Sequence, residues 1–216
     1  SSLLAAAAYI LERKDEAEAT VAAVRQMGRQ SAAFGADVSD AQAVAAMVLN
    51  IEKALGPIDI LVNNAGVALR RSLEEITEAD FDYTIATNLK SAFLCTQAVW
   101  PGMRARGWGR IVNISSGAAR GAGVVAVHYN ASKAGMEGLT RGYAARLVNY
   151  GITVNAVAPS LIDTEMMASQ RAENAAKVPL GRLGTSEEVA MAVVMVATNA
   201  YMTGQTVQVN GGRHFN

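Results

Sequence analysis

The stretch Ile58-Asp59-Ile60-Leu61-Val62-Asn63-Asn64-Ala65-Gly66 joins a short apolar run to a turn of small and amide-bearing residues. A run of this kind, rich in β-branched residues and bounded by turn residues, is typical of a buried strand. Three later runs share its character, at residues 110–114, 152–157 and 206–209. The sequence therefore predicts buried strands at four places along the chain.

The segments between these runs have the spacing of amphipathic helices. Apolar residues recur every three or four positions in three sets: Phe81, Ile85, Leu89 and Phe93; Leu139, Tyr143 and Leu147; and Val189, Val193 and Val196. Two helix starts carry the residues of a capping box, Thr77 with Asp80 and Thr185 with Glu188. Because parallel strands need long crossovers, the alternation predicts an α/β fold with a Rossmann-type, doubly wound parallel sheet flanked by helices.

The composition excludes several kinds of partner. Lys and Arg number 19, as do Asp and Glu, so the chain has no net charge to attract nucleic acid or a membrane surface. A single cysteine, Cys95, allows no internal disulfide, and the separation of His128 from His214 gives no sign of a metal site. Apolar runs fall short of the roughly 18 residues that a membrane span needs, and no basic segment precedes the first alanines. We therefore expect a cytoplasmic protein without metal, nucleic acid or membrane as partner.

Side chains suited to acid–base chemistry follow the predicted strands, where open α/β sheets bind their ligands. Tyr129 and Lys133 lie four residues apart in a helical pattern, so both project from one face, where an ammonium would lower the pKa of the phenol. Ser116 follows the strand at 110–114, and its hydroxyl could hold a carbonyl or alkoxide oxygen. Asn88 offers an amide that could connect the lysine to solvent. Each feature alone also fits an ordinary helix or turn, and their joint order along one sheet favours a site.

Together these motifs resemble the signature set of the short-chain dehydrogenase/reductase family in order and spacing. The set comprises Asn63-Asn64-Ala65-Gly66, Asn88, Ser116 and Tyr129-Asn130-Ala131-Ser132-Lys133. The resemblance extends from about Asp37 to Val209-Asn210-Gly211-Gly212 and includes residues 179–184. Within the family, the chain looks most like the 3-oxoacyl-thioester reductases.

The resemblance implies a catalytic role for four residues. Tyr129 would be the general acid that protonates the substrate oxygen in reduction, or the base in oxidation. Lys133 would lower the pKa of Tyr129 and bind the nicotinamide ribose. Ser116, rather than its neighbour Ser115, would orient the substrate oxygen, and Asn88 would hold a water of the proton relay.

The resemblance also implies contacts with the dinucleotide cofactor. Asp37 and the backbone of Val38 would bond the adenine. The adenosine ribose would lie along Asn63, Ala65 and Gly66. The nicotinamide carboxamide would meet Ile162 and Thr164, and Pro159, Tyr129 and Lys133 would complete the cofactor site. Ser160 stands where the family usually has a glycine after the proline, so its β-carbon is expected to restrict the backbone there.

The chain departs from the family pattern at its start. The family opens with a strand and a glycine-rich turn that holds the cofactor pyrophosphate, and neither precedes Asp37 at the usual interval. We therefore expect residues 1–216 to form a single Rossmann-like catalytic domain that is incomplete at its N-terminus. Either the chain is the retained part of a longer enzyme, or it is a truncation that binds the dinucleotide poorly. The alanines from Ala5 to Ala8 are expected to be helical, next to the strand-like Tyr9.

Cofactor choice depends on the end of the family's second strand, where an acidic residue favours NAD and basic residues favour the 2′-phosphate of NADP. Glu12, Arg13 and Lys14 are the candidates for this position. The two basic side chains favour NADP(H) slightly over NAD(H). A solvated charge cluster at a helix start explains the same residues equally well.

The predicted function is an NAD(P)(H)-dependent oxidoreductase that interconverts a ketone and a secondary alcohol by hydride transfer. A 3-oxoacyl thioester is one candidate substrate, although Tyr150 stands where carrier-protein reductases often have a basic residue; Arg104 and Arg106 could still form a basic patch. Sugars, polyols and other small ketones remain open, and residues 166–177 would be the lid over the substrate. The alternative is a non-catalytic or regulatory relative that has lost its cofactor affinity.

The resemblance further implies a homotetramer. Its subunits would meet through the helices around residues 91–100 and 129–150, with another interface near the C-terminus. Trp100, Trp108 and Phe215 are either anchors of these interfaces or part of the core.

Overall fold

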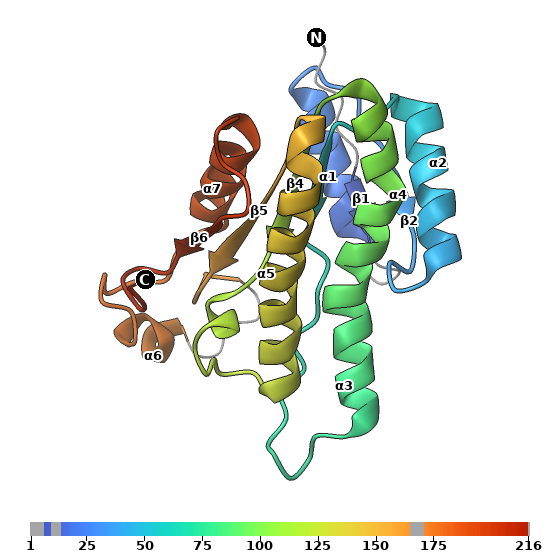
Figure 1. Ribbon diagram of the computed structural model, residues 1–216. Helices are drawn as coiled ribbons and strands as arrows, with labels where there is room; N and C mark the ends of the chain where they lie inside the picture. The colour runs from blue at the N-terminus through green and yellow to red at the C-terminus, as the bar shows by residue number, and fades with distance from the viewer. Residues whose placement is uncertain (1–6, 10–13, 165–170, 216) are drawn as a thin grey trace.

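The structure is a computed structural model that describes residues 7–9, 14–164 and 171–215 (Figure 1). In chain order the strands are β1 (Ala7–Tyr9), β2 (Ala33–Gly35), β3 (Ile60–Asn63), β4 (Gly109–Ile114), β5 (Ile152–Pro159) and β6 (Thr206–Val209). The α-helices are α1 (Lys14–Gln26), α2 (Ala41–Leu55), α3 (Glu78–Ile85), α4 (Ser91–Arg106), α5 (Val127–Leu147), α6 (Arg171–Ala176) and α7 (Ser186–Thr198). Every strand pair is parallel, which confirms the predicted α/β fold with a parallel sheet flanked by helices.

The central sheet has the strand order β3-β4-β5-β6, and helices cover both of its faces (Figure 1). Ile111 and Val154 point to one face, where they pack with residues of α4 and α5. Val112 and Val157 point to the other, where they pack against Val196 of α7. Because both faces are covered, β4 and β5 are buried along almost their whole length, and their buried amides, Asn113 and Asn155, form hydrogen bonds within the protein.

The described strands fall into two sheets, because β1 pairs with β2 and β3 pairs with β4 alone. Phe34 of β2 and Leu61 of β3 nevertheless belong to one hydrophobic cluster, which α2 and α4 cover. The free edge of β3 leaves Ile60 and Val62 about two fifths exposed. No glycine lies between Ala7 and Gly28, so no glycine-rich turn follows β1. That residues 1–216 lack the family's first strand and its glycine-rich loop stays a prediction.

The expectation of a helix over the alanine run is wrong for Ala7 and Ala8, while Ala5 and Ala6 lie outside the described residues. Ala7 and Ala8 both belong to β1, in register with Ala33 and Phe34 of β2. Alanine's intrinsic preference for the helix is worth well under ~1 kcal/mol per residue, and pairing with a strand distant in sequence overrides it.

Both predicted capping boxes are present. The Thr77 side chain accepts from the Asp80 backbone N–H at the start of α3, and Thr185 accepts from that of Glu188 at the start of α7. The helical pattern beginning near Phe81 continues from α3 through a π-helical turn, Ala86–Lys90, into α4. Among the described residues, no helix is both long enough and apolar enough to span a membrane.

Candidate active site

The two serines after β4 have different surroundings, and only one of them contacts Tyr129. Ser115 is buried, and its hydroxyl donates to the Lys133 carbonyl oxygen at 3.2 Å and to the Glu137 carboxylate at 3.4 Å. Ser116 is partly exposed, accepts from the Ala118 backbone N–H at 3.2 Å and hydrogen-bonds with the phenol of Tyr129. The side chain placed beside the tyrosine is therefore that of Ser116, while Ser115 fastens β4 to α5.

Tyr129 and Lys133 lie on one face of the first turns of α5. The ammonium nitrogen of Lys133 is 5.8 Å from the centre of the Tyr129 ring and donates to the Ile114 carbonyl oxygen at 2.8 Å. Lys133 is only 5% exposed and forms no salt bridge within the described residues. The helix spacing and the end of β4 thus bring Ser116, Tyr129 and Lys133 together.

Burial dominates the protonation of both groups. It lowers the pKa of the Lys133 ammonium from 10.5 to about 8, because the charged form loses its solvation. Burial also raises the pKa of the Tyr129 phenol, and the hydrogen bond with Ser116 offsets only part of this increase. In this structure the phenol is therefore protonated at neutral pH, which suits a proton donor. Burial, which raises the pKa of Tyr129, outweighs the lowering that was expected from Lys133.

Asn88 lies in the π-helical turn between α3 and α4 and is completely buried. Its amide oxygen accepts from the Val67 backbone N–H at 2.7 Å, and its amide nitrogen donates to the Val67 carbonyl oxygen at 2.9 Å and to Ser132 at 3.1 Å. π-Turns are often found at functional sites. Here the turn directs the amide of Asn88 at the loop after β3 and at α5, and no pattern in the sequence predicts the contacts with Val67 and Ser132.

The backbone of Gly66 lies close to the side chains of Asn88 and Lys133. A β-carbon at Gly66 would lie 3.2 Å from the Asn88 amide oxygen and 3.6 Å from the Lys133 ammonium nitrogen. A side chain here would require the Asn88 amide to shift by a few tenths of an ångström. The exposed backbone at Gly66, with the donor of Lys133 beside it, leaves room for a ligand to approach the backbone closely.

Asn63 has a structural role that the sequence did not predict. Its buried amide donates to Asn113 of β4 at 2.8 Å and to Thr96 of α4 at 3.3 Å. Asn113 in turn donates to Thr140 of α5 at 2.9 Å. Because its side chain is committed to this network, Asn63 can contribute to a cofactor site only through its backbone. Ala65, further along the turn, packs with the cluster beneath α2 and α4.

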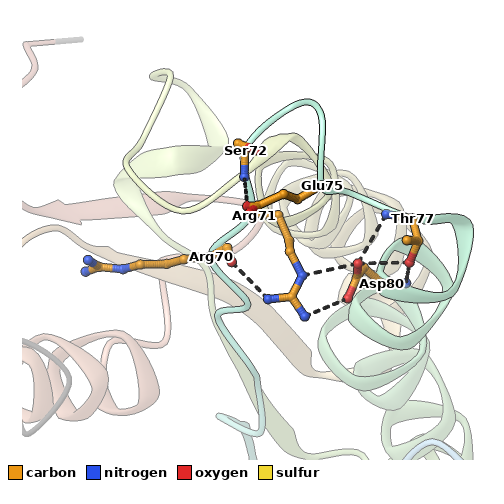
Figure 2. Close-up of polar contacts among 6 residues, drawn as sticks. All are labelled: Arg70, Arg71, Ser72, Glu75, Thr77 and Asp80. Atoms are coloured by element: carbon orange, nitrogen blue, oxygen red, sulfur yellow. Dashed lines mark hydrogen bonds and ion pairs between the residues drawn. The ribbon is translucent and has the colours of Figure 1, made fainter.

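The loop between β3 and α3 is fastened at a second point by an ion pair (Figure 2). Arg71 donates to the Asp80 carboxylate, with nitrogen–oxygen distances of 3.2 and 3.3 Å, and also to the Arg70 carbonyl oxygen at 3.1 Å. These bonds and those with Thr77 lower the pKa of Asp80. The Arg70 side chain points away from the cluster. Asn88 and Asp80 thus hold both ends of the loop that begins at Gly66.

The predicted adenine contacts lie after β2. Asp37 is exposed, and one of its carboxylate oxygens accepts from the backbone N–H and the hydroxyl of Ser39, at 2.9 and 2.7 Å, which lowers its pKa. The other carboxylate oxygen has no partner among the described residues, while the Val38 side chain is buried in the cluster beneath α2. Of the residues expected to choose between NAD and NADP, Glu12 and Arg13 lie outside the described residues.

The backbone after β5 turns sharply, although Ser160 replaces the expected glycine. Pro159 ends β5, and the residue with a positive φ is Leu161, at 53°, not Ser160. The β-carbon of Ser160 is therefore accommodated without a left-handed conformation, and Leu161 adopts that conformation while buried with Val178 and Leu183. Ile162 follows in a parallel bridge with Gly184.

The end of the predicted lid is a short helix, α6, while residues 165–170 lie outside the described residues. Arg171, the first residue of α6, donates to the Asp163 carboxylate at 2.6 Å, next to the exposed Thr164. Ala175 packs on the cluster of Leu161. The helix is thus attached to the segment after β5, where the nicotinamide contacts were predicted.

Comparisons with known proteins agree with this geometry. The sequence profile of the family described as "Enoyl-(Acyl carrier protein) reductase" matches residues 5–214. An acetoacetyl-CoA reductase of Rhizobium meliloti is 42% identical over 83% of the chain and 77% of its own length. A 3-oxoacyl-[acyl-carrier-protein] reductase of Pseudomonas aeruginosa is 41% identical over 92% of the chain and 83% of its own length.

A solved structure shows the same fold. A protein of Agrobacterium tumefaciens, described as a gluconate dehydrogenase, superposes with a TM-score of 0.88 at 30% sequence identity, over 95% of this chain and 85% of that one. The profile match spans nearly the whole chain, and the relatives share far more than a local motif. The chain therefore belongs to the short-chain dehydrogenase/reductase family, as its motifs predicted, and is an NAD(P)-dependent oxidoreductase that acts on ketone and alcohol groups.

Proposed function

We propose that the site formed by Ser116, Tyr129 and Lys133 reduces the ketone of a small molecule to a secondary alcohol. The observation that carries this proposal is the hydrogen bond between the Ser116 hydroxyl and the Tyr129 phenol, above the buried ammonium of Lys133. Two hydroxyl groups that bond each other can both bond one substrate oxygen placed between them. The alternative of a non-catalytic relative gains no support from a site whose acid–base residues are all brought together.

The dinucleotide supplies the hydride that reaches the carbonyl carbon. Ser116 holds the carbonyl oxygen, and Tyr129 transfers its phenolic proton to that oxygen as negative charge develops there. Lys133, with a pKa of about 8, carries a proton at neutral pH and stabilises the phenolate that remains. Asn88 fixes the loop at Val67 and the start of α5 at Ser132, and so keeps the surface of Gly66 in place.

For the cofactor we propose a slight preference for NADP(H), supported by the basic pair Arg13 and Lys14. Lys14 begins α1 and lies 3.6 Å from Glu18, with both side chains more than half exposed. Such a surface ion pair is worth at most ~1 kcal/mol, so Lys14 is available to a ligand phosphate. Asp37 and Val38 are proposed for the adenine, and the turn from Asn63 to Gly66 for the adenosine ribose.

A small molecule is a better candidate substrate than an acyl chain on a carrier protein. The Arg104 guanidinium lies over the rings of Trp100 and Tyr150, at 4.8 and 5.6 Å. Arg106 forms an ion pair with Asp59 at 3.1 Å. Of these two arginines, Arg106 is paired with a carboxylate and Arg104 contacts aromatic rings, so within the described residues the patch has one positive charge without an acidic partner instead of two. A cytoplasmic location belongs to the same proposal.

We also propose that the chain forms a homotetramer. A groove of about 580 Å³ runs between α5 and the segment from α3 to α4. Its lining includes Leu89, Phe93, Gly135, Gly138, Leu139 and Gly142. Phe93 is 40% exposed, although it belongs to the apolar stripe of its helix. The glycines give α5 a flat surface on which the α5 helix of a second copy can pack closely.

Gly138→Glu tests this assembly. A β-carbon at Gly138 meets nothing within 4 Å, so the substitution leaves the isolated subunit intact. A charged side chain in the groove would be buried without a partner on assembly, and we expect the variant to sediment as a dimer, held by the expected interface near the C-terminus, where the unmodified protein is a tetramer. An unchanged mass by analytical ultracentrifugation would contradict the proposed interface. Ala46→Glu, at an exposed helical position of α2 outside the groove, is the control.

Ser116→Ala and Ser115→Ala form a matched pair. Ser116→Ala is expected to lower kcat about 10²-fold or more, because it removes a donor to the reacting oxygen, while the only stability it loses is that of the capping bond with Ala118. Ser115→Ala removes buried bonds to α5 and is expected to cost about 1 kcal/mol of stability with a much smaller loss of turnover. The reverse pattern in steady-state kinetics and thermal unfolding would transfer the catalytic role to Ser115.

The proposed reaction is tested by mixing the protein with NADPH or NADH and a panel of ketones that includes acetoacetyl-CoA and small keto acids. Oxidation of the dinucleotide that depends on a ketone, with formation of the secondary alcohol, supports the proposal. A folded protein that binds dinucleotide and oxidises it with none of the ketones would refute it.

A further inference from the structure

The C-terminal segment lies against the loop that follows Ser116. A β-carbon at Gly121 would lie 3.1 Å from two atoms of the His214 ring, and one at Gly117 would lie 3.8 Å from the same ring. The amide of Asn210 donates to the His214 carbonyl oxygen at 3.0 Å and closes this segment into a turn. The segment thus forms one wall beside the residues that follow the catalytic serine.

Arg213, in the same turn, is a half-buried cation without an anionic partner in the described part of the chain. One of its terminal guanidinium nitrogens donates to the Ser160 hydroxyl at 2.9 Å. By contrast, Arg182 donates to both carboxylate oxygens of Glu188. A guanidinium has five N–H donors, and a neutral hydroxyl satisfies one of them. Arg213 therefore keeps most of its capacity for binding an anion.

The contact with Ser160 places this cation close to the reacting groups. Ser160 directly follows Pro159 at the carboxyl end of β5, and its backbone is not in the left-handed conformation. A serine at this position therefore differs from the family's usual glycine only by its side chain. A β-carbon on Gly117 would lie 2.9 Å from the β-carbon of Ser160 and 3.1 Å from its hydroxyl oxygen. Arg213 thus reaches the backbone next to Ser116 through a single intervening side chain.

We propose that Arg213 binds a carboxylate on the substrate, and that the substrates of this site are accordingly keto acids and the matching hydroxy acids. This inference rests on the proposed function, because it assigns Ser116 to the carbonyl oxygen of the same molecule. A guanidinium bonds a carboxylate through two parallel N–H donors, which fixes orientation as well as affinity. Arg213 would hold the acid end while Ser116 and Tyr129 hold the ketone, and Ser160 keeps the guanidinium in position.

A series of straight-chain keto acids and their methyl esters tests the inference. The ester keeps the ketone and removes the charge. We expect the unmodified protein to prefer the acid, and Arg213→Met to lower the acid-to-ester ratio of kcat/KM by about 10- to 100-fold, the effect of losing a charge-assisted hydrogen-bonded pair. Arg213→Lys is expected to recover part of the ratio. Arg29→Met, which removes an exposed arginine, is the control.

A ratio that does not change in Arg213→Met overturns the inference. Calorimetric titration with the keto acids separates this failure from a failure of the proposed function. If the folded protein reduces neither acid nor ester but binds the acid in a way that Arg213→Met weakens, the reaction is wrong and the carboxylate site stands. If the two proteins bind the acid equally, or neither binds it, the carboxylate site is wrong.

Discussion

Tyr129→Phe is expected to lower kcat by about 10²- to 10⁴-fold, the range that a well-placed general acid contributes. The change deletes the one proton that the site can transfer to a substrate oxygen and removes almost no volume. The hydrogen bond with Ser116 is lost, but the ring stays in place over Lys133. Binding of the dinucleotide should therefore change little.

The measurement is steady-state turnover, together with a fluorescence titration of the reduced dinucleotide. Tyr83→Phe, at a tyrosine that is 51% exposed, controls for the loss of a phenol as such. Near-normal turnover in Tyr129→Phe would remove this residue from the reaction, and an equal loss in both variants would mean that the effect is not local to the site.

Lys133→Met is expected to abolish most turnover and, at neutral pH, to stabilise the fold. The ammonium is 5% exposed and bonds one carbonyl oxygen, so folding lowers its pKa from 10.5 to about 8. A lysine whose pKa is lower in the folded state binds fewer protons there than in the unfolded chain. Stability therefore increases as the pH rises from about 8 to about 10.5, and below pH ~8 the full destabilisation remains.

This destabilisation amounts to about 3 kcal/mol, which is the free energy that corresponds to lowering the pKa from 10.5 to about 8. Lys133→Met also loses the hydrogen bond to Ile114, which costs about 1 kcal/mol of stability. The variant is therefore expected to be about 2 kcal/mol more stable than the parent near pH 7, and this difference decreases towards pH 10. Urea unfolding at both pH values measures it, with the exposed Lys53→Met as control. A variant that is less stable than the parent near pH 7 would show that the ammonium is well solvated or paired.

The sequence predicted the parts of the fold that are long or have local rules. The strands β4 and β5 are β-branched runs buried on both faces, β6 is a shorter, half-buried run, and the capping boxes at Thr77 and Thr185 depend on residues three positions apart. The strands β1 and β2 were not predicted as strands, because they have three residues each and are rich in alanine and glycine. Nothing local distinguishes such segments from a helix or a loop, and only their pairing makes them strands.

The candidate site also has features that the sequence predicts and features that it does not. The spacing of Tyr129 and Lys133 on a helix, and the position of Ser116 after a strand, were enough to predict that they come together. The role of Asn63 could not be predicted in this way, because the sequence is the same whether an amide beside a turn binds a ligand or, as here, Asn113 and Thr96.

The C-terminal wall was not predicted for a related reason. Arg213 lies far along the chain from Ser160, and no pattern in the sequence links the two. Their bond depends on the turn closed by Asn210 and on the backbone after β5, where Leu161 and not Ser160 has the positive φ. Contacts of this kind follow from the assembled fold and not from spacing.

Titration of the protein with NADPH and NADH, followed by the fluorescence of the reduced nicotinamide, is the most direct test of this function. It should be run on the chain and on a version with the expected first strand and glycine-rich turn added ahead of Ser1. We expect saturable binding by at least the extended form, tighter for NADPH and weakened by Lys133→Met. A folded, extended protein that binds neither dinucleotide would contradict the assignment of Ser116, Tyr129 and Lys133 to hydride-transfer chemistry.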